Sequence, residues 1–195
     1  MNTPSTLARP RVYLAGPDVF HPNSDDIFAG LIADCERFGL EALVPSDSAH
    51  EKLKGGGATT TGEQKAQCFF EANIDMLRRA DAVVANLQAF RGLEPDSGTV
   101  FEVGFAHALG LPVVAYGVPA TTYGARVCAA LGSVRDAHGA MRDRATGMMV
   151  EEFDQRLNLM LARSVVAIAD SPEAALRQVA EQLRAQSSAR CSVGR

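Results

Sequence analysis

The chain of 195 residues is long enough to bury one substantial hydrophobic core, and no shift in composition divides it into two domains. Hydrophobic residues make up 47% of it and charged residues 22%, which is typical of a folded globular protein and excludes a disordered one. The formal net charge of −4, without any run of lysine and arginine, argues against a nucleic-acid polymer or a membrane surface as the main partner.

The cysteines and the two ends of the chain add further expectations. The four cysteines are widely separated and form no C-x-x-C pair, so we expect free thiols rather than disulfides or a zinc site. No stretch has the apolar character of a signal peptide or the apolar length of a membrane span, which favours a cytoplasmic protein. We expect one folded domain at 11–186, between a flexible N-terminus at 1–10 and a frayed tail at 187–195.

The first half of the chain alternates between strand and helix patterns. Residues 11–16 form an apolar run that stops at a Gly-Pro pair, which predicts a first buried strand. The apolar spacing over 25–38 predicts a helix that Gly39 would end as its C′ residue, and 41–44 predicts a short second strand. Residues 46–62, with three consecutive glycines and three consecutive threonines, predict a mobile loop.

The second half continues the alternation. The predicted helices are 64–80, the segment around Glu102, 155–162 and 172–185, and the predicted strands are 81–87, 111–116 and 164–169. Residues 120–152 show no periodicity and predict irregular structure. Strands that alternate with helices in this way predict a doubly wound α/β sandwich of the flavodoxin or Rossmann type, with a parallel sheet of about five strands.

Glu102 is the most unusual residue, because its neighbours from 100 to 109 are almost all apolar or glycine. A buried carboxylate is costly unless it is paired or hydrogen-bonded. Two explanations fit. Thr99 and Glu102 match a capping box in the first turn of a helix, which is a structural role. Alternatively, Glu102 is a catalytic carboxylate that the helix N-terminus keeps charged.

Other polar residues converge on the same end of the predicted sheet. In open α/β sheets, ligands bind beyond the carboxyl ends of the strands, and Asp96 and Glu102 follow the strand at 81–87 there. Asp75 fits a solvated helix residue, Asp96 fits an Asx-turn, and Tyr13 fits a packed strand residue, but each also fits a site residue. The histidines lack ligand spacing, so we expect no metal site.

Four segments, taken in chain order, resemble the nucleoside 2-deoxyribosyltransferase family. They are 12–17, 73–75, 96–102 with the following Gly-Phe-Ala, and 158–160. The spacing from Asp96 to Glu102 is the most specific element of the match. The resemblance implies an enzyme that moves a 2-deoxyribosyl group from one nucleobase to another through a covalent glycosyl-enzyme, without a metal or other cofactor.

The resemblance also implies roles for individual residues. Glu102 would be the nucleophile that attacks C1′, and Tyr13 would orient its carboxylate. Asp75 would exchange a proton with the base, and Asp96 would recognise the base or share that proton, so that this aspartate pair holds a proton while Glu102 stays charged. Substrate contacts are implied at Gly16, Pro17, Phe20, Gly98, Asn158 and Met160. The last two would reach across from a neighbouring subunit, which implies a homo-oligomer, with a deoxyribonucleoside and a free nucleobase as partners.

Two other functions stay open on the sequence. A hydrolase would resolve the same covalent intermediate with water, and could act on deoxynucleosides or on their 5′-monophosphates. The first loop reads Gly16-Pro17-Asp18, and the charge of Asp18 would repel a phosphate, which favours nucleosides. A non-catalytic nucleoside or nucleotide sensor would bind in the crevice without turnover, but it would have no need of Glu102 as a nucleophile.

Overall fold

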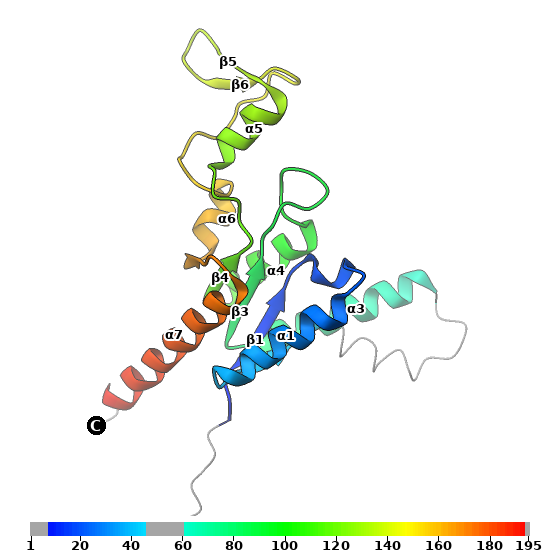
Figure 1. The fold of residues 1–195 in the computed structure, drawn as a ribbon, viewed down its shortest axis with the longest axis vertical. Helices are drawn as coiled ribbons and strands as arrows, with labels where there is room; N and C mark the ends of the chain where they lie inside the picture. The colour runs from blue at the N-terminus through cyan, green and yellow to red at the C-terminus, as the bar shows by residue number, and fades with distance from the viewer. Residues whose placement is uncertain (1–7, 46–60, 194–195) are drawn as a thin grey trace, which may run out of the picture.

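The computed structural model describes residues 8–45 and 61–193, which form an α/β sandwich (Figure 1). Its main sheet has five strands, all parallel, in the order β2-β1-β3-β4-β7. These strands are β1 (Arg11–Ala15), β2 (Glu41–Leu43), β3 (Ala82–Asn86), β4 (Val113–Tyr116) and β7 (Ala167–Ile168). The predicted fold class is confirmed. Most of the loop predicted at 46–62 and of the N-terminus predicted to be flexible lies outside the described residues.

The strand order reverses at β1, because β2 lies on one side of it and β3, β4 and β7 follow on the other. Such a switch point opens a crevice beyond the carboxyl ends of the two strands that diverge. Here it lies beside β1 and β3, whose register aligns Tyr13 with Val83 and Ala15 with Ala85. The short 3-10 helix η1 (Pro17–Phe20) leaves β1 at this crevice.

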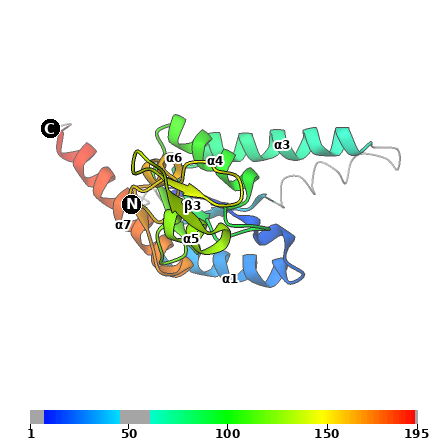
Figure 2. The same cartoon turned by 90° about the horizontal axis from the view of Figure 1, so that it is seen from above.

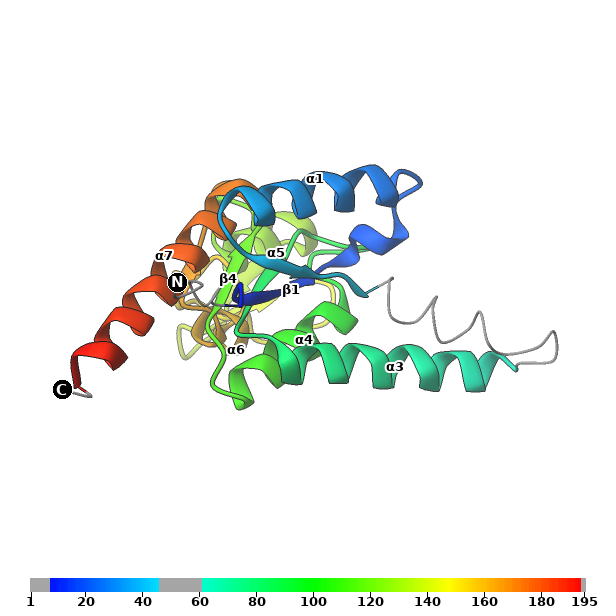
Figure 3. The same cartoon turned by 90° about the horizontal axis from the view of Figure 1, so that it is seen from below.

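Helices cover both faces of the sheet (Figures 2 and 3). One layer consists of α1 (Ser24–Arg37) and α7 (Pro172–Val193), and the other of α3 (Gly62–Arg79), α4 (Ser97–Ala108) and α6 (Leu159–Ser164). We call them the α1–α7 layer and the α3–α4–α6 layer. Among the described residues, no helix combines the length and the apolar composition that crossing a lipid bilayer requires.

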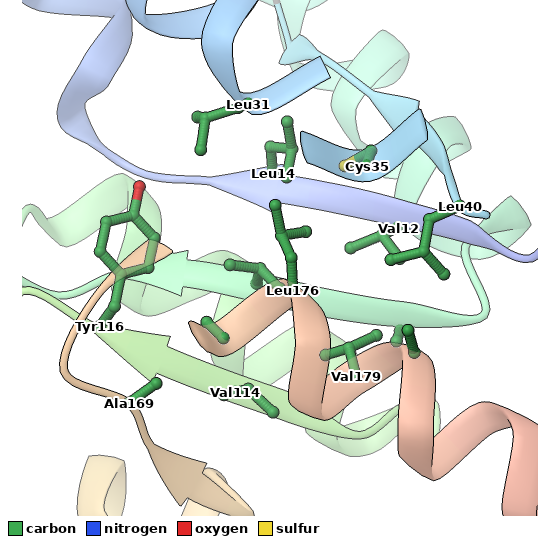
Figure 4. Packing of buried hydrophobic residues seen from close by; sticks show 14 of the residues in the cluster. Val12, Leu14, Leu31, Cys35, Leu40, Val114, Tyr116, Ala169, Leu176 and Val179 are labelled. Carbon is green, nitrogen blue, oxygen red and sulfur yellow. The ribbon is translucent and has the colours of Figure 1, made fainter. Parts of the chain in front are cut away.

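Each helical layer packs on the sheet through its own hydrophobic core. Figure 4 shows the core under the α1–α7 layer, where Leu31 of α1 and Leu176 of α7 lie near Leu14 of β1. On the opposite face, Leu77 of α3 and Val103 of α4 belong to the second core. A sheet that is covered on both faces needs central strands without a polar side, and accordingly every residue of β3 is buried.

The ends of the helices follow local signals in the sequence. Gly39 has a φ of +78° after α1, as the predicted C′ residue should, and Ser171 Oγ caps α7 by accepting a bond from the Ala174 N–H at 3.1 Å. The last helix is longer than predicted, because α7 continues past 185 to Val193. There the Ser187 hydroxyl donates back to the Leu183 carbonyl at 3.0 Å, so serine does not interrupt the helix.

The segment predicted to be irregular contains regular structure, so that prediction is wrong. It forms α5 (Tyr123–Leu131) and a hairpin in which β5 (Ser133–Arg135) pairs antiparallel with β6 (Met141–Asp143). Together with their connections these elements make an arm, residues 118–156, that stands above the carboxyl ends of the strands in Figure 1. Each strand of the hairpin has only three residues, which is too short for a period-two pattern to be recognised.

Two arginines hold the base of the arm. Arg126 donates from Nη1 to the carbonyls of Thr121 at 2.7 Å and of Arg156 at 2.9 Å. Arg156 in turn donates from Nε to the Pro119 carbonyl at 2.9 Å and from Nη2 to the Val118 carbonyl. These bonds join the chain that enters the arm to the chain that leaves it, so the arm has a fixed attachment.

A buried polar network joins the carboxyl ends of β1, β3 and β4. Asn86, at the end of β3, donates from Nδ2 to both carboxylate oxygens of Asp18, at 3.0 and 3.2 Å. The Tyr116 hydroxyl, at the end of β4, donates to Asp18 Oδ2 at 3.4 Å. Glycines leave room for the network, because an added Cβ would lie 2.5 Å from Asp18 Oδ2 at Gly16 and 2.5 Å from Asn86 Oδ1 at Gly117.

Gly117→Ala should therefore destabilise the fold more than Gly139→Ala. Both glycines have a positive φ, +72° and +84°, which costs an L side chain about 1–2 kcal/mol. Only at Gly117 does the new methyl group also meet Asn86, and such overpacking costs about another 1–3 kcal/mol, whereas no atom lies within 4 Å of it at Gly139. Urea unfolding of both variants measures the difference, and equal losses would show that the network does not pack against Gly117.

Candidate active site

The structure brings two of the predicted site residues into direct contact. Tyr13 is fully buried in β1, and its hydroxyl donates a hydrogen bond to Glu102 Oε1 of α4 at 2.6 Å. Glu102 itself is partly exposed, so the pair connects the core to solvent beside β1 and β3. The bond satisfies two polar groups that would each be costly to bury without a partner.

The helix that carries Glu102 begins earlier than predicted. Its N-cap is Asp96, whose Oδ2 accepts bonds from the Thr99 N–H at 2.9 Å and from the Thr99 hydroxyl at 3.0 Å. The capping box of Thr99 and Glu102 is therefore wrong, because Asp96 is the N-cap and Thr99 lies inside the first turn, where its own N–H binds the Asp96 carboxylate. Glu102 consequently falls in the second turn, where its side chain meets Tyr13.

The electrostatics of Glu102 also differ from the prediction. Burial raises the pKa of Glu102 from its ordinary value to about 7; the Tyr13 hydrogen bond lowers this pKa, and the charge of Asp96 raises it. The prediction that the helix N-terminus keeps Glu102 charged is wrong, because that effect fades beyond the first turn. Burial and the nearby Glu102 charge raise the pKa of Tyr13 well above its usual range, so its hydroxyl stays a donor.

Asp96 affects the site through its charge and through its position at the start of α4. Its charge raises the pKa of Glu102 and so disfavours the ionised form of that carboxyl. Gly98 follows the cap and is exposed, and an added Cβ there would lie 3.0 Å from Asp96 Oδ2. A side chain at Gly98 would therefore crowd the capping carboxylate.

Asp75 lies on α3, in the same helical layer as the helix that carries Glu102. Asp75 is exposed on α3, whereas its neighbours Ala72 and Met76 are buried, and it is not among the groups that shift the pKa of Glu102. Sequence reasoning treated Asn73 only as part of a motif, yet its Oδ1 is buried and has no hydrogen-bond partner among the described residues. The signal was its spacing, since Asn73 lies three residues before the buried Met76.

An aromatic platform lies at the rim, next to Gly16 and Pro17. Phe20 of η1 is 58% exposed, and its ring stacks on that of Phe90, with 5.4 Å between centroids. The guanidinium of Arg91 lies 4.6 Å from the centroid of the Phe90 ring. The sequence analysis missed Phe90 and Arg91, although an aromatic and an arginine in the loop after a central strand are a recognisable signal for a planar ligand.

Two further predicted residues lie at the start of α6. Asn158 caps α6, where its Oδ1 accepts a bond from the Leu161 N–H at 3.2 Å. Met160 follows it and is 76% exposed. In the part of the chain that the structure describes, no three histidine, cysteine or acidic side chains gather in a way that could hold a metal ion.

Solved structures of known proteins share this architecture. A 2-desoxiribosyltransferase from Leishmania mexicana superposes with a TM-score of 0.64 and 31% identity, over 88% of this chain and 97% of its own. A 2-deoxyribosyltransferase from Bacillus psychrosaccharolyticus (TM-score 0.50, 17% identity, 83% and 87% covered) shares the fold. So does a conserved protein from Enterococcus faecalis V583 (TM-score 0.55, 18% identity, 90% and 99% covered).

Sequence comparisons agree with the fold. An uncharacterized protein of Schizosaccharomyces pombe is 30% identical over 108 residues, and this match covers 55% of the present chain and about half, 49%, of the curated relative. The family model described as nucleoside 2-deoxyribosyltransferase matches residues 12–160, a range that begins in β1 and ends in α6. It includes both residues of the hydrogen-bonded pair. The chain belongs to the nucleoside 2-deoxyribosyltransferase family.

Proposed function

We propose that this protein exchanges the nucleobase of 2′-deoxyribonucleosides through a covalent deoxyribosyl intermediate on Glu102. The observation that carries the proposal is the 2.6 Å hydrogen bond by which the buried Tyr13 hydroxyl holds the Glu102 carboxyl. A carboxyl with a pKa of about 7 is ionised in a large fraction of molecules at neutral pH. Its burial makes the ionised form less well solvated, and therefore a stronger nucleophile.

The chemistry consists of two displacements. Ionised Glu102 attacks C1′ from the face opposite the base, so that a C1′–O bond forms while the C1′–N bond breaks. The electron pair of the broken bond leaves with the base nitrogen, which takes up a proton. A second base then attacks C1′, loses its proton and releases Glu102 as a carboxylate. Two inversions give net retention, as in retaining glycoside hydrolysis. The missing 2′-hydroxyl makes deoxynucleosides more reactive, since it would withdraw electrons from C1′.

The proton needs a donor near the departing base. The resemblance assigns proton exchange to Asp75, but this residue is exposed on α3. We propose Asp96 instead, because it lies at the start of α4, near enough for its charge to act on Glu102. Asp75 would act only on a base that extends over α3, and Asp75→Asn separates the two assignments.

The base is proposed to lie on the platform of Phe20 and Phe90, beside the first loop formed by Gly16 and Pro17. A neutral sugar hydroxyl suits this loop better than a phosphate. Pro17 has no N–H to donate, and Asp18 places a buried carboxylate directly after it. This supports nucleosides over their 5′-monophosphates as substrates.

The protein is also proposed to act as a homo-oligomer, in which Asn158 and Met160 of one subunit approach the sugar site of another. Exposure of Met160 supports this arrangement, since its side chain is accessible to another subunit. The two residues lie at the start of α6, on the same layer as α4.

Exchange should be visible when 2′-deoxyinosine is incubated with adenine and the nucleosides are followed by chromatography. Glu102→Gln should lose base exchange by at least ~1000-fold, because the amide cannot form the glycosyl ester, while circular dichroism stays unchanged. Asp75→Asn serves as the matched change of another carboxylate and should cost less than ~10-fold. Exchange that persists in Glu102→Gln would overturn the assignment. Free base without a new nucleoside would indicate a hydrolase, and no change at all a binding protein.

The pH dependence of kcat/KM should have an ascending limb near pH 7, because Glu102 must lose its proton to attack. Tyr13→Phe removes the bond that lowers the pKa of Glu102, so the limb should move to higher pH. Asp96→Asn removes a charge that raises this pKa but keeps a good N-cap, so the limb should move to lower pH. Limbs that stay in place in both variants would show that Glu102 does not control the profile.

The free energy of unfolding should also depend on whether Glu102 is protonated. Because the folded pKa of Glu102, about 7, lies above its ordinary value of 4.5, the folded state binds more protons than the unfolded state between these values. Wild-type stability should therefore fall as the pH rises from 4.5 to 7. Glu102→Gln has no proton to lose in this range, so its stability should not fall. It should be more stable than wild type by up to about 3 kcal/mol at pH 8, and equal to wild type below pH 4. Urea unfolding at both pH values tests this, and a constant difference would contradict it.

A further inference from the structure

Arg91 is the only lysine or arginine in the loop that follows β3, residues 87–96, and its side chain lies against the aromatic platform. The guanidinium is 4.6 Å from the centroid of the Phe90 ring and 5.6 Å from that of the Phe20 ring. Across the described parts of the chain, no carboxylate forms an ion pair with Arg91, and none of its N–H groups donates a hydrogen bond. Its five N–H donors are therefore available to a ligand.

The two carboxylates of the same loop bind other groups. Glu94 accepts a hydrogen bond from the hydroxyl of Tyr123, at the start of α5. Asp96 caps α4 and accepts the Thr99 N–H. An arginine is normally paired where an acidic residue lies within reach, so the arrangement of this loop reserves the guanidinium for an acceptor from outside the chain.

The backbone of Arg91 is strained. Its φ of +54° lies in the left-handed region, which L residues rarely adopt. The Phe90 N–H donates to the Glu94 carbonyl at 2.9 Å and closes the turn around Arg91, so this conformation is fixed. A glycine would adopt it without strain, and Gly92 follows directly, yet position 91 carries a long cationic side chain. Strain of this kind is concentrated at ligand-binding sites.

The buried network under the platform fixes where the two rings lie. Asp18 precedes Phe20 by two residues, and Asn86 precedes Phe90 by four. The bond from Asn86 Nδ2 to Asp18 Oδ1 at 3.0 Å joins these two segments, and Asn86 Oδ1 accepts the Gln88 N–H at 3.3 Å. A base that stacks on the rings therefore meets the Arg91 guanidinium at a defined place.

We propose that Arg91 makes the site selective for 6-oxopurines, the bases that present two adjacent acceptors on one edge. A guanidinium carries donors only, in a planar fork that fits the O6 and N7 atoms of guanine or hypoxanthine. Adenine places an amino donor beside N7, cytosine presents an amino donor, and thymine has a methyl group beside O4. None of these three bases offers the fork two acceptors. The proposal rests on the proposed function and names the class of base that it uses.

A phosphate is the other acceptor that an arginine fork fits. Two observations favour the base. The guanidinium lies against two aromatic rings, and these suit a planar ligand rather than a tetrahedral one. The buried carboxylate of Asp18, in the same first loop as Phe20, would repel an anionic group.

The charge of Arg91 also suits the departure of the base. When the C1′–N bond breaks, its electron pair leaves with the base, and part of the negative charge spreads to O6 and N7 of an oxopurine. A cation that binds these two atoms stabilises the departing base more than the bound nucleoside.

Competition between two acceptor bases in one reaction tests the selectivity. With 2′-deoxyguanosine as donor and equal concentrations of hypoxanthine and adenine, wild type should form at least ~5-fold more 2′-deoxyinosine than 2′-deoxyadenosine, as a bidentate arginine–base contact provides. Both bases compete for the same glycosyl-enzyme, so changes in the donor step cancel from this ratio. Chromatography at early times measures it.

Arg91→Gln should lower the ratio at least ~5-fold, because glutamine offers one donor and one acceptor, the pattern that matches N7 and N6 of adenine. Arg177→Gln is the matched control, since Arg177 is exposed on α7 in the opposite layer, and it should keep the wild-type ratio. Circular dichroism checks that both variants are folded. Equal ratios in wild type and Arg91→Gln would overturn the proposal. So would a loss in Arg91→Gln that appears only with 2′-deoxyguanosine 5′-monophosphate as donor, since Arg91 would then bind the phosphate.

Binding of the free bases separates this proposal from the proposed function. Isothermal titration calorimetry needs no turnover, and wild type should bind hypoxanthine at least ~5-fold more tightly than adenine, a preference that Arg91→Gln should lose. A wild type that shows this preference but exchanges no bases leaves the role of Arg91 standing and refutes the proposed function. Exchange that uses both bases equally would refute the role of Arg91 and leave the proposed function standing.

Discussion

The hydrogen bond between Tyr13 and Glu102 constrains both the fold and the chemistry. Tyr13 is held in a central strand that is buried on both faces, so its hydroxyl has to find a partner inside the protein. Glu102 supplies it from a helix that packs across the same strands. Removing either side chain leaves the other polar group without its partner. The site therefore depends on how closely α4 is held against β1.

That dependence carries a cost in stability. The raised pKa of Glu102 means that the ionised form, which the proposed chemistry requires, is disfavoured by the surroundings that make it reactive. Asp96 contributes twice to this balance. It stabilises the start of α4 as a cap, and its charge opposes ionisation of Glu102.

The sequence predicted the sheet and most helices because their signals are strong and local: apolar runs for buried strands, and caps such as Ser171 for helix ends. It misplaced the start of α4, because Asp96 and Thr99 are both good caps and only packing decides between them. The prediction that Glu102 is charged followed from the misplaced start of α4. The exposure of Asp75 agrees with the solvated helix residue that the pattern of α3 indicates. The burial of the Asn73 oxygen depends on how α3 is rotated against the sheet, and no local pattern fixes this.

The arm shows how an appendage can be anchored without constraining its far end. Arg126 and Arg156 bind main-chain carbonyls at its base, so the anchorage does not depend on which side chains the carbonyl-bearing residues carry. At the other end, the turn between β5 and β6 is exposed at 137–139 and is closed by the ion pair of Asp136 with Arg142 at 2.7 Å. This turn is thus a natural place for inserting a foreign loop. The graft would be displayed on a stiff support, away from the strand ends where substrates are expected to bind.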